Sequence, residues 1–98
     1  MNQTFLIAGA LSNDLFRLAN MAHKKSEKGA VVFLREAKKR SGELEVMKKP
    51  EYIANIVRNI KSRSSNDVSP KSAETYLMYA ILLQNYSLQG IKNMNSQQ

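Results

Sequence analysis

The 98-residue chain has no cysteine and few glycines and prolines. The absence of cysteine excludes disulfides, thiol nucleophiles, iron–sulfur clusters and zinc sites built on thiolates. Four glycines and two prolines are too few for an all-β fold with many tight turns. No apolar run approaches the roughly 18 residues that suggest a membrane span, and the first residues lack the pattern of a signal peptide. We therefore expect a cytoplasmic protein.

Residue patterns typical of catalysis are also missing. His23 is the one histidine, and although Glu27 follows it at i+4, no strained nucleophile turn or further set of ligands accompanies it. We interpret His23 as a surface residue near a helix end. The eight carboxylates are scattered, and the glycines are too far apart for a phosphate-binding loop. The sequence thus predicts no catalytic residue, no metal site and no cofactor, and we expect the protein not to be an enzyme.

Four segments have the apolar period of a helix. The apolar stripes, the N-cap residues and the breaks between them predict an all-α, four-helix antiparallel bundle, because short loops favour antiparallel neighbours. We expect a single domain over residues 1–98, with a frayed polar tail at 92–98. The predicted helices span about 4–25, 27–41, 50–63 and 70–89.

Capping signals fix the expected helix ends. Ser26 is the expected N-cap of the second helix and Gly42 the residue just past its end. Pro50 fits the first position of the third helix. Ser69-Pro70 forms the clearest start signal, and Gly90 is expected to end the fourth helix, with residue 91 folding back. In the first helix we favour a continuous segment, with a break near Ser12 as the open alternative.

The helix at 70–89 has apolar residues on every side. No charged residue occurs from 76 to 91, and a helix that is apolar all round is usually buried all round. We expect Leu77, Ala80, Ile81 and Leu83 to be buried. Met78 and Leu82 are expected either to form a homodimer interface or to lie beneath the linker at 43–49.

The positive charge is concentrated between residues 17 and 63. This segment contains 13 lysines and arginines but only five carboxylates, and the net charge of the whole chain is +7. On the second helix, Lys28, Val32, Arg35 and Lys39 align away from the predicted core. We expect this face to bind an acidic macromolecule, with an acidic protein as the first hypothesis. The alternative is sequence-nonspecific contact with nucleic-acid phosphates. A third possibility is a small-ligand pocket lined by Tyr76, Tyr79 and Tyr86, although such spacing more often serves packing.

Overall fold

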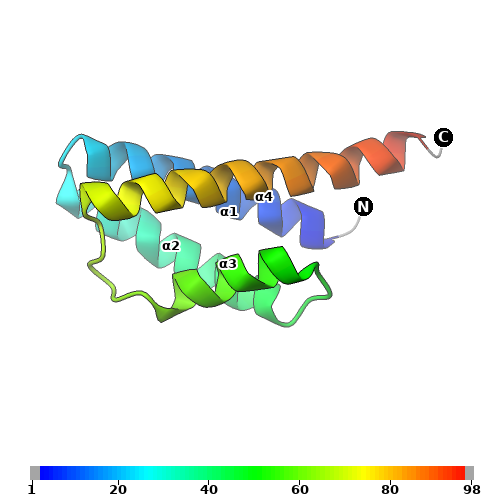
Figure 1. Ribbon diagram of the computed structural model, residues 1–98, viewed down its shortest axis with the longest axis horizontal. Helices are drawn as coiled ribbons and strands as arrows, with labels where there is room; N and C mark the ends of the chain where they lie inside the picture. Colours follow the sequence, from blue (N-terminus) through cyan, green and yellow to red (C-terminus); the bar gives the residue numbers. More distant parts are fainter. Residues whose placement is uncertain (1–2, 97–98) are drawn as a thin grey trace.

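Four helices make up residues 3–96, the part of the chain that the computed structural model describes, with side-chain surroundings described for residues 3–92. No strand occurs within this range. The predicted all-α, four-helix antiparallel bundle is confirmed (Figure 1). The helices are α1 (Gln3–His23), α2 (Glu27–Glu45), α3 (Glu51–Ser62) and α4 (Pro70–Ser96).

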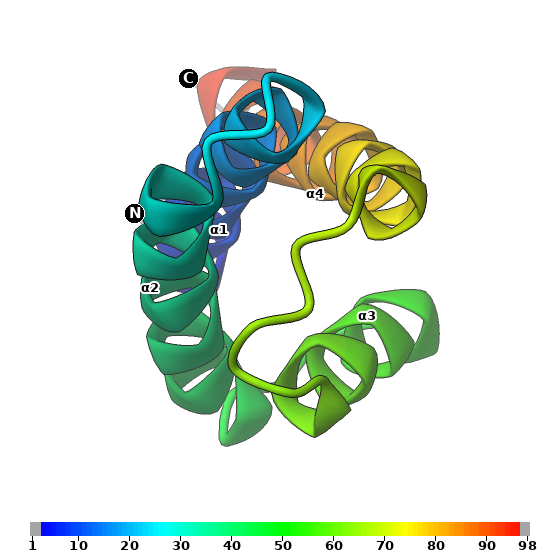
Figure 2. The same ribbon diagram turned by 90° about the vertical axis from the view of Figure 1, so that its left-hand side faces the viewer.

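The central position in the bundle belongs to α1. It packs against both α2 and α4, whereas α3 packs mainly against α2. Figure 2 shows the resulting order around the bundle, α4–α1–α2–α3, with the segment 63–69 crossing between α3 and α4 at one end. The two ends of this order are therefore α4 and α3, and within residues 3–96 no helix covers the side of α4 that faces away from α1.

The core lies between the apolar stripes of the four helices. Each stripe repeats every three or four residues, which brings its members to one side of a helix. The strongest example is α3, where four β-branched residues are at most 3% exposed. These are Ile53, Ile56, Val57 and Ile60.

The turn between α1 and α2 ends α1 in a Schellman motif. The Ser26 amide donates to the Met21 carbonyl at 2.9 Å, and the Lys25 amide donates to the Ala22 carbonyl at 3.1 Å. Lys25 has a positive φ of 60°, a conformation that a glycine adopts more readily. Ser26 holds the predicted N-cap position, but its side chain makes no capping hydrogen bond.

Two helix starts were predicted at prolines. At α4 the Ser69 hydroxyl accepts from the Ser72 amide at 3.1 Å, and α4 begins at Pro70, as expected. At α3 the proline lies one position earlier than expected. Pro50 is the N-cap, in an extended conformation, and the helix begins at Glu51.

Two predicted helix ends at glycines are wrong. Gly42 lies inside α2, which continues to Glu45, because burial of Leu44 in the core outweighs the helix penalty of one glycine. Gly90 lies inside α4, which continues to Ser96 through residues that were expected to fray. A Cβ at Gly90 would lie 2.2 Å from Cγ of Phe5, so this glycine permits close helix packing. Residues 97 and 98 lie outside the described residues.

The first helix has no break at Ser12. Ser12 is buried, and its hydroxyl donates to the Ala80 carbonyl of α4 at 2.7 Å. A second hydrogen bond runs in the opposite direction, from α4 to α1: the Ser87 hydroxyl donates to the Phe5 carbonyl at 2.8 Å. The polar residue that suggested a break therefore joins α1 to α4.

Candidate functional site

The outer side of α2 carries the predicted binding residues Lys28, Val32, Arg35 and Lys39, which we call the α2 basic face. All four are exposed, and Val32 exposes 49% of its surface. Residues that are four, three and four positions apart lie on one side of a helix. The opposite side of α2 packs against α1 and α3. The structure thus brings the four residues together, and their role in binding stays a prediction.

The three cations of the α2 basic face have no hydrogen-bond or ion-pair partner in the described part of the chain. Their charge is therefore available to an anion that approaches from solvent. Several other cations of the protein are already engaged with carboxylates. These pairs are Arg40–Asp14, Arg58–Glu51, Lys61–Glu45 and Arg63–Asp67.

A shallow hollow lies on the α2 basic face. It is lined by Glu27, Lys28, Val31, Val32 and Arg35. The hollow is open to solvent, so it could take a side chain of a partner but would not enclose a small molecule. Its two valines offer apolar contact between charges of both signs. A partner that complements this hollow therefore needs apolar as well as charged groups.

The outer side of α4 is exposed, contrary to part of the prediction. Ala80 and Leu83 are buried as expected, but Leu77 is 43% exposed and Ile81 is 46% exposed. The reason is that α4 lies at the edge of the bundle and packs mainly against α1. One stripe of buried residues on α4 forms the contact with α1, and the apolar residues outside this stripe face solvent.

Met78 and Leu82 also lie on this exposed side, with exposures of 52% and 37%. The alternative that a linker covers them is wrong. The connection from α2 to α3 spans 46–50 and lies near the start of α1, where the Thr4 hydroxyl donates to the Met47 sulfur at 3.6 Å. The other alternative, a dimer contact, stays a prediction.

The single histidine lies in the last turn of α1, and Glu27 lies in the first turn of α2. Both are exposed, and the described structure contains no hydrogen bond or ion pair between them. His23 lines a mainly apolar groove between α1 and α4, beside Phe16 and Leu77. Nothing in this arrangement orients the imidazole for base catalysis.

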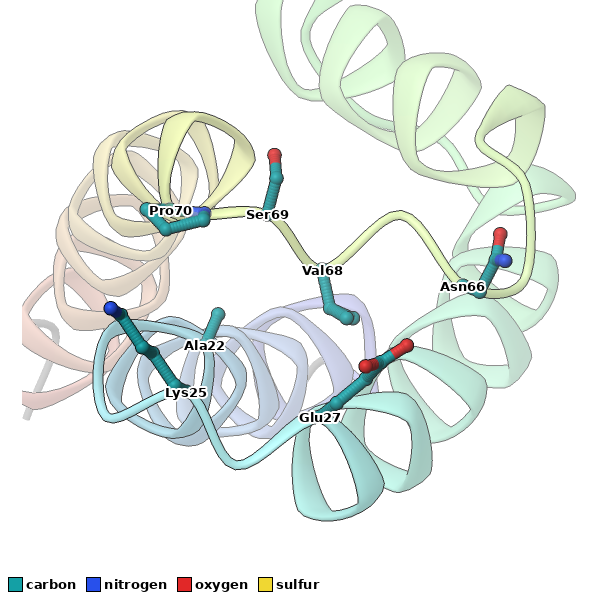
Figure 3. Close-up of a pocket in the computed structure, with 7 residues that line it drawn as sticks. All are labelled: Ala22, Lys25, Glu27, Asn66, Val68, Ser69 and Pro70. Carbon is teal, nitrogen blue, oxygen red and sulfur yellow. The ribbon is translucent and has the colours of Figure 1, made fainter.

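A pocket of about 340 Å³ lies between the α1–α2 turn and the start of α4 (Figure 3). Lys25 and Glu27 border it from one side, and Asn66, Val68 and Ser69 border it from the other. The lining contains one cation and one anion, and both are exposed. These groups therefore favour no single class of ligand.

The tyrosines of α4 serve mainly in packing. Tyr76 is fully buried, its hydroxyl donates to the Asp67 carbonyl at 2.7 Å, and the Arg63 guanidinium lies 4.9 Å from its ring centre. Burial raises the pKa of Tyr76 above its ordinary value of 10.0. Tyr86 is 8% exposed and stacks at a tilt on Phe5, with ring centres 4.9 Å apart.

Sequence reasoning missed this junction between α3 and α4. Arg63 donates to Asp67 at 3.1 Å and to the Ser72 hydroxyl at 3.3 Å, and Ser72 in turn donates to Asp67. The i, i+4 spacing of Arg63 and Asp67 was a usable signal. The segment looked like an unstructured polar loop, however, and its contacts with Tyr76 depend on the tertiary fold.

The fold and these surfaces define a small helical bundle with one exposed basic face and one exposed apolar face. Comparison of the chain with protein-family models, with curated protein sequences and with solved structures gives no match. Among the described residues, no helix has an apolar stretch long enough to cross a membrane.

Proposed function

We propose that this protein is a binding module that engages an acidic segment of a partner protein through the α2 basic face. The observation that carries the proposal is a helix side that combines a half-exposed valine with three cations that have no ion-pair partner among the described residues. Lys28, Arg35 and Lys39 attract the carboxylates of the partner. Val32 and the hollow beside it receive an apolar side chain, which gives the contact a desolvated centre.

Acidic residues on the same helix favour a protein over nucleic acid. Glu27 lines the hollow, and Glu43 is exposed one turn beyond Lys39. A phosphate backbone carries regularly spaced negative charge, so these carboxylates would repel it at both ends of the face. An acidic peptide can instead place neutral or basic residues opposite them.

Nucleic acid is the second candidate, and one observation favours it. Lys24 and Lys25 are exposed in the α1–α2 turn and have no ion-pair partner among the described residues. They extend the positive surface beyond the first turn of α2. Such an extension could follow phosphates without reading bases.

The experiment measures fluorescence anisotropy of two labelled probes, a short acidic peptide with interspersed leucines and a short DNA duplex, over a range of salt concentrations. We expect the peptide to bind, and Arg35→Glu with Lys39→Glu to weaken its binding by about tenfold or more. We expect Val32→Ala to weaken peptide binding measurably, because a desolvated anchor is lost.

The matched control is Lys48→Glu with Lys71→Glu, two exposed cations outside the face with the same change in net charge. The control should leave peptide binding nearly unchanged. Equal losses in the two double variants would show that only total charge matters, which contradicts the proposal. Tight binding of the duplex, with a log–log salt slope of about −0.9 per phosphate and no effect of Val32→Ala, would assign the face to nucleic acid instead.

A further inference from the structure

Two stripes of residues with heptad spacing run along α4, one buried against α1 and one on the outer side. The seam against α1 consists of residues 73, 76, 80, 83, 87 and 90, which are all buried. The outer stripe has spacings of four, three, four, three and four, which is the pattern of a coiled-coil seam. All of its members are exposed in the single chain. The outer stripe consists of Glu74, Met78, Ile81, Asn85, Leu88 and Lys92.

The charges of the outer stripe stand at its two ends and are opposite in sign. Between Glu74 and Lys92 the helix has no charged residue. Neither of the two has an ion-pair partner in the described part of the chain. A partner that covers the stripe should therefore present a cation near Glu74 and an anion near Lys92.

A second copy of α4 meets this requirement when it runs antiparallel. A two-fold axis near Leu83 places each residue opposite one that lies equally far on the other side of Leu83. The stripe then pairs only with itself, whereas a parallel arrangement would place like charges opposite each other. The antiparallel layers are Glu74 with Lys92, Met78 with Leu88, and Ile81 with Asn85.

We propose that a second copy of this chain covers the outer stripe through antiparallel, two-fold pairing of α4 with α4. Such an interface is isologous, because the same surface of each copy takes part. A chain with net charge +7 repels its copies, and the middle of this stripe is free of charge. The α2 basic face lies on another helix and is not required for the pairing.

The size of the stripe sets the expected strength. From Glu74 to Lys92 the stripe covers 19 residues, which corresponds to about 27 Å of helix at 1.5 Å per residue, and its width is that of one helix. A contact of this size belongs with interfaces below about 1,200 Å² in total, which are typical of weak association. We therefore expect a dissociation constant on the order of micromolar.

Analytical ultracentrifugation of the full chain over a range of protein concentrations tests the pairing. We expect a monomer–dimer equilibrium for the wild type. Ile81→Lys should weaken the dimer at least about 100-fold, because it places a cation in the desolvated centre. Glu74→Lys and Lys92→Glu should each weaken it about tenfold, and the double variant that carries both changes should recover to within about threefold.

Control variants carry the same charge changes elsewhere. Glu43→Lys matches Glu74→Lys, and Lys48→Glu matches Lys92→Glu. Both should leave the dissociation constant unchanged. Circular dichroism melts of every variant separate lost pairing from lost folding, and all substituted side chains are exposed.

Three results would overturn the proposal. The wild type could remain monomeric at millimolar concentration, the dimer could survive Ile81→Lys, or the double exchange could fail to restore what the single changes remove. A monomer that instead binds vesicles of anionic phospholipid, and loses that binding with Ile81→Asp, would assign the stripe to a membrane surface.

Discussion

The two helix pairs α1–α4 and α2–α3 are held together by different means. Across α1–α4 side chains of one helix pack against glycines of the other, and serine hydroxyls bond directly to carbonyls of the facing helix. Across α2–α3 the apolar contact is bordered by long charged side chains. Lys61 pairs with Glu45 at 2.6 Å, and Lys38 donates to the Lys61 carbonyl at 3.0 Å. The first pair should therefore respond to added volume, and the second to pH and salt.

The largest effect is expected for Gly90→Ala. A Cβ at this position meets the Phe5 ring at 2.2 Å, so the ring or the helix must move. Overpacking of this kind typically lowers the free energy of unfolding by about 1–3 kcal/mol. Urea denaturation followed by circular dichroism measures the loss.

Gly42→Ala is the matched control in the other helix pair. Apart from its chain neighbours and the nearby backbone of its own helix, a Cβ at Gly42 would meet no atom within 4 Å, and Ala favours a helix over Gly by about 0.5–1 kcal/mol. The control should therefore raise the free energy of unfolding. If Gly90→Ala stabilised the protein as Gly42→Ala is expected to do, the close packing of the Phe5 ring against Gly90 would be wrong.

An intermediate effect is expected for Tyr76→Phe, at the junction between the two helix pairs. Loss of the hydrogen bond to the Asp67 carbonyl should lower the free energy of unfolding by about 1 kcal/mol near neutral pH. The pKa of Tyr76 is raised in the folded protein, chiefly by burial. The unfolded chain therefore loses this proton at lower pH than the folded protein does.

The sign of the alkaline effect follows from that order. The contribution of Tyr76 is fully present below the ordinary tyrosine pKa of 10.0, and it falls as the pH rises towards the folded-state value. The phenylalanine of the variant has no proton to lose, so the free energy of unfolding of the variant does not fall for this reason. The difference in free energy of unfolding between wild type and Tyr76→Phe should therefore become smaller in urea titrations at alkaline pH. A gap that stays constant with pH would contradict burial of the hydroxyl.

The smallest effect is expected for Glu45→Gln. The hydrogen bond and charge of Lys61 lower the pKa of Glu45 below its ordinary 4.5. Its stabilising contribution is therefore present above that pH and is lost as the pH falls through the folded-state pKa. The melting temperatures of wild type and variant should differ slightly near neutral pH and converge in acid. The pair is exposed, so salt should reduce the difference as well.

The sequence predicted the four helices because their apolar periods and caps are local signals. Ser69 caps α4 as expected, and the stripe of α1 correctly outweighed the polar residue at Ser12. Gly90 was misread because a glycine that ends a helix and one that admits a ring from another helix look alike in sequence. Leu77 and Ile81 on the outer side of α4 were assigned to the core because the apolar residues of α4 do not reveal that α1 occupies the central place.

The candidate site was predictable in part for the same reason. Exposure of the α2 basic face followed from the position of the α2 core stripe, which is local information. The charge pattern from Glu74 to Lys92 was also present in the sequence. Its significance depends on α4 being at the edge of the bundle, and that is a property of the tertiary fold.

The hydroxyl bonds between α1 and α4 also bear on the order in which the protein folds. They join residues 68 and 82 positions apart. During synthesis α1 can pair with α2 once α2 has been made, because that hairpin is local. The contact of α1 with α4 can form only after the chain has been synthesised as far as Gly90. The nascent protein therefore carries α1 half covered on the ribosome, and α4 closes the core last.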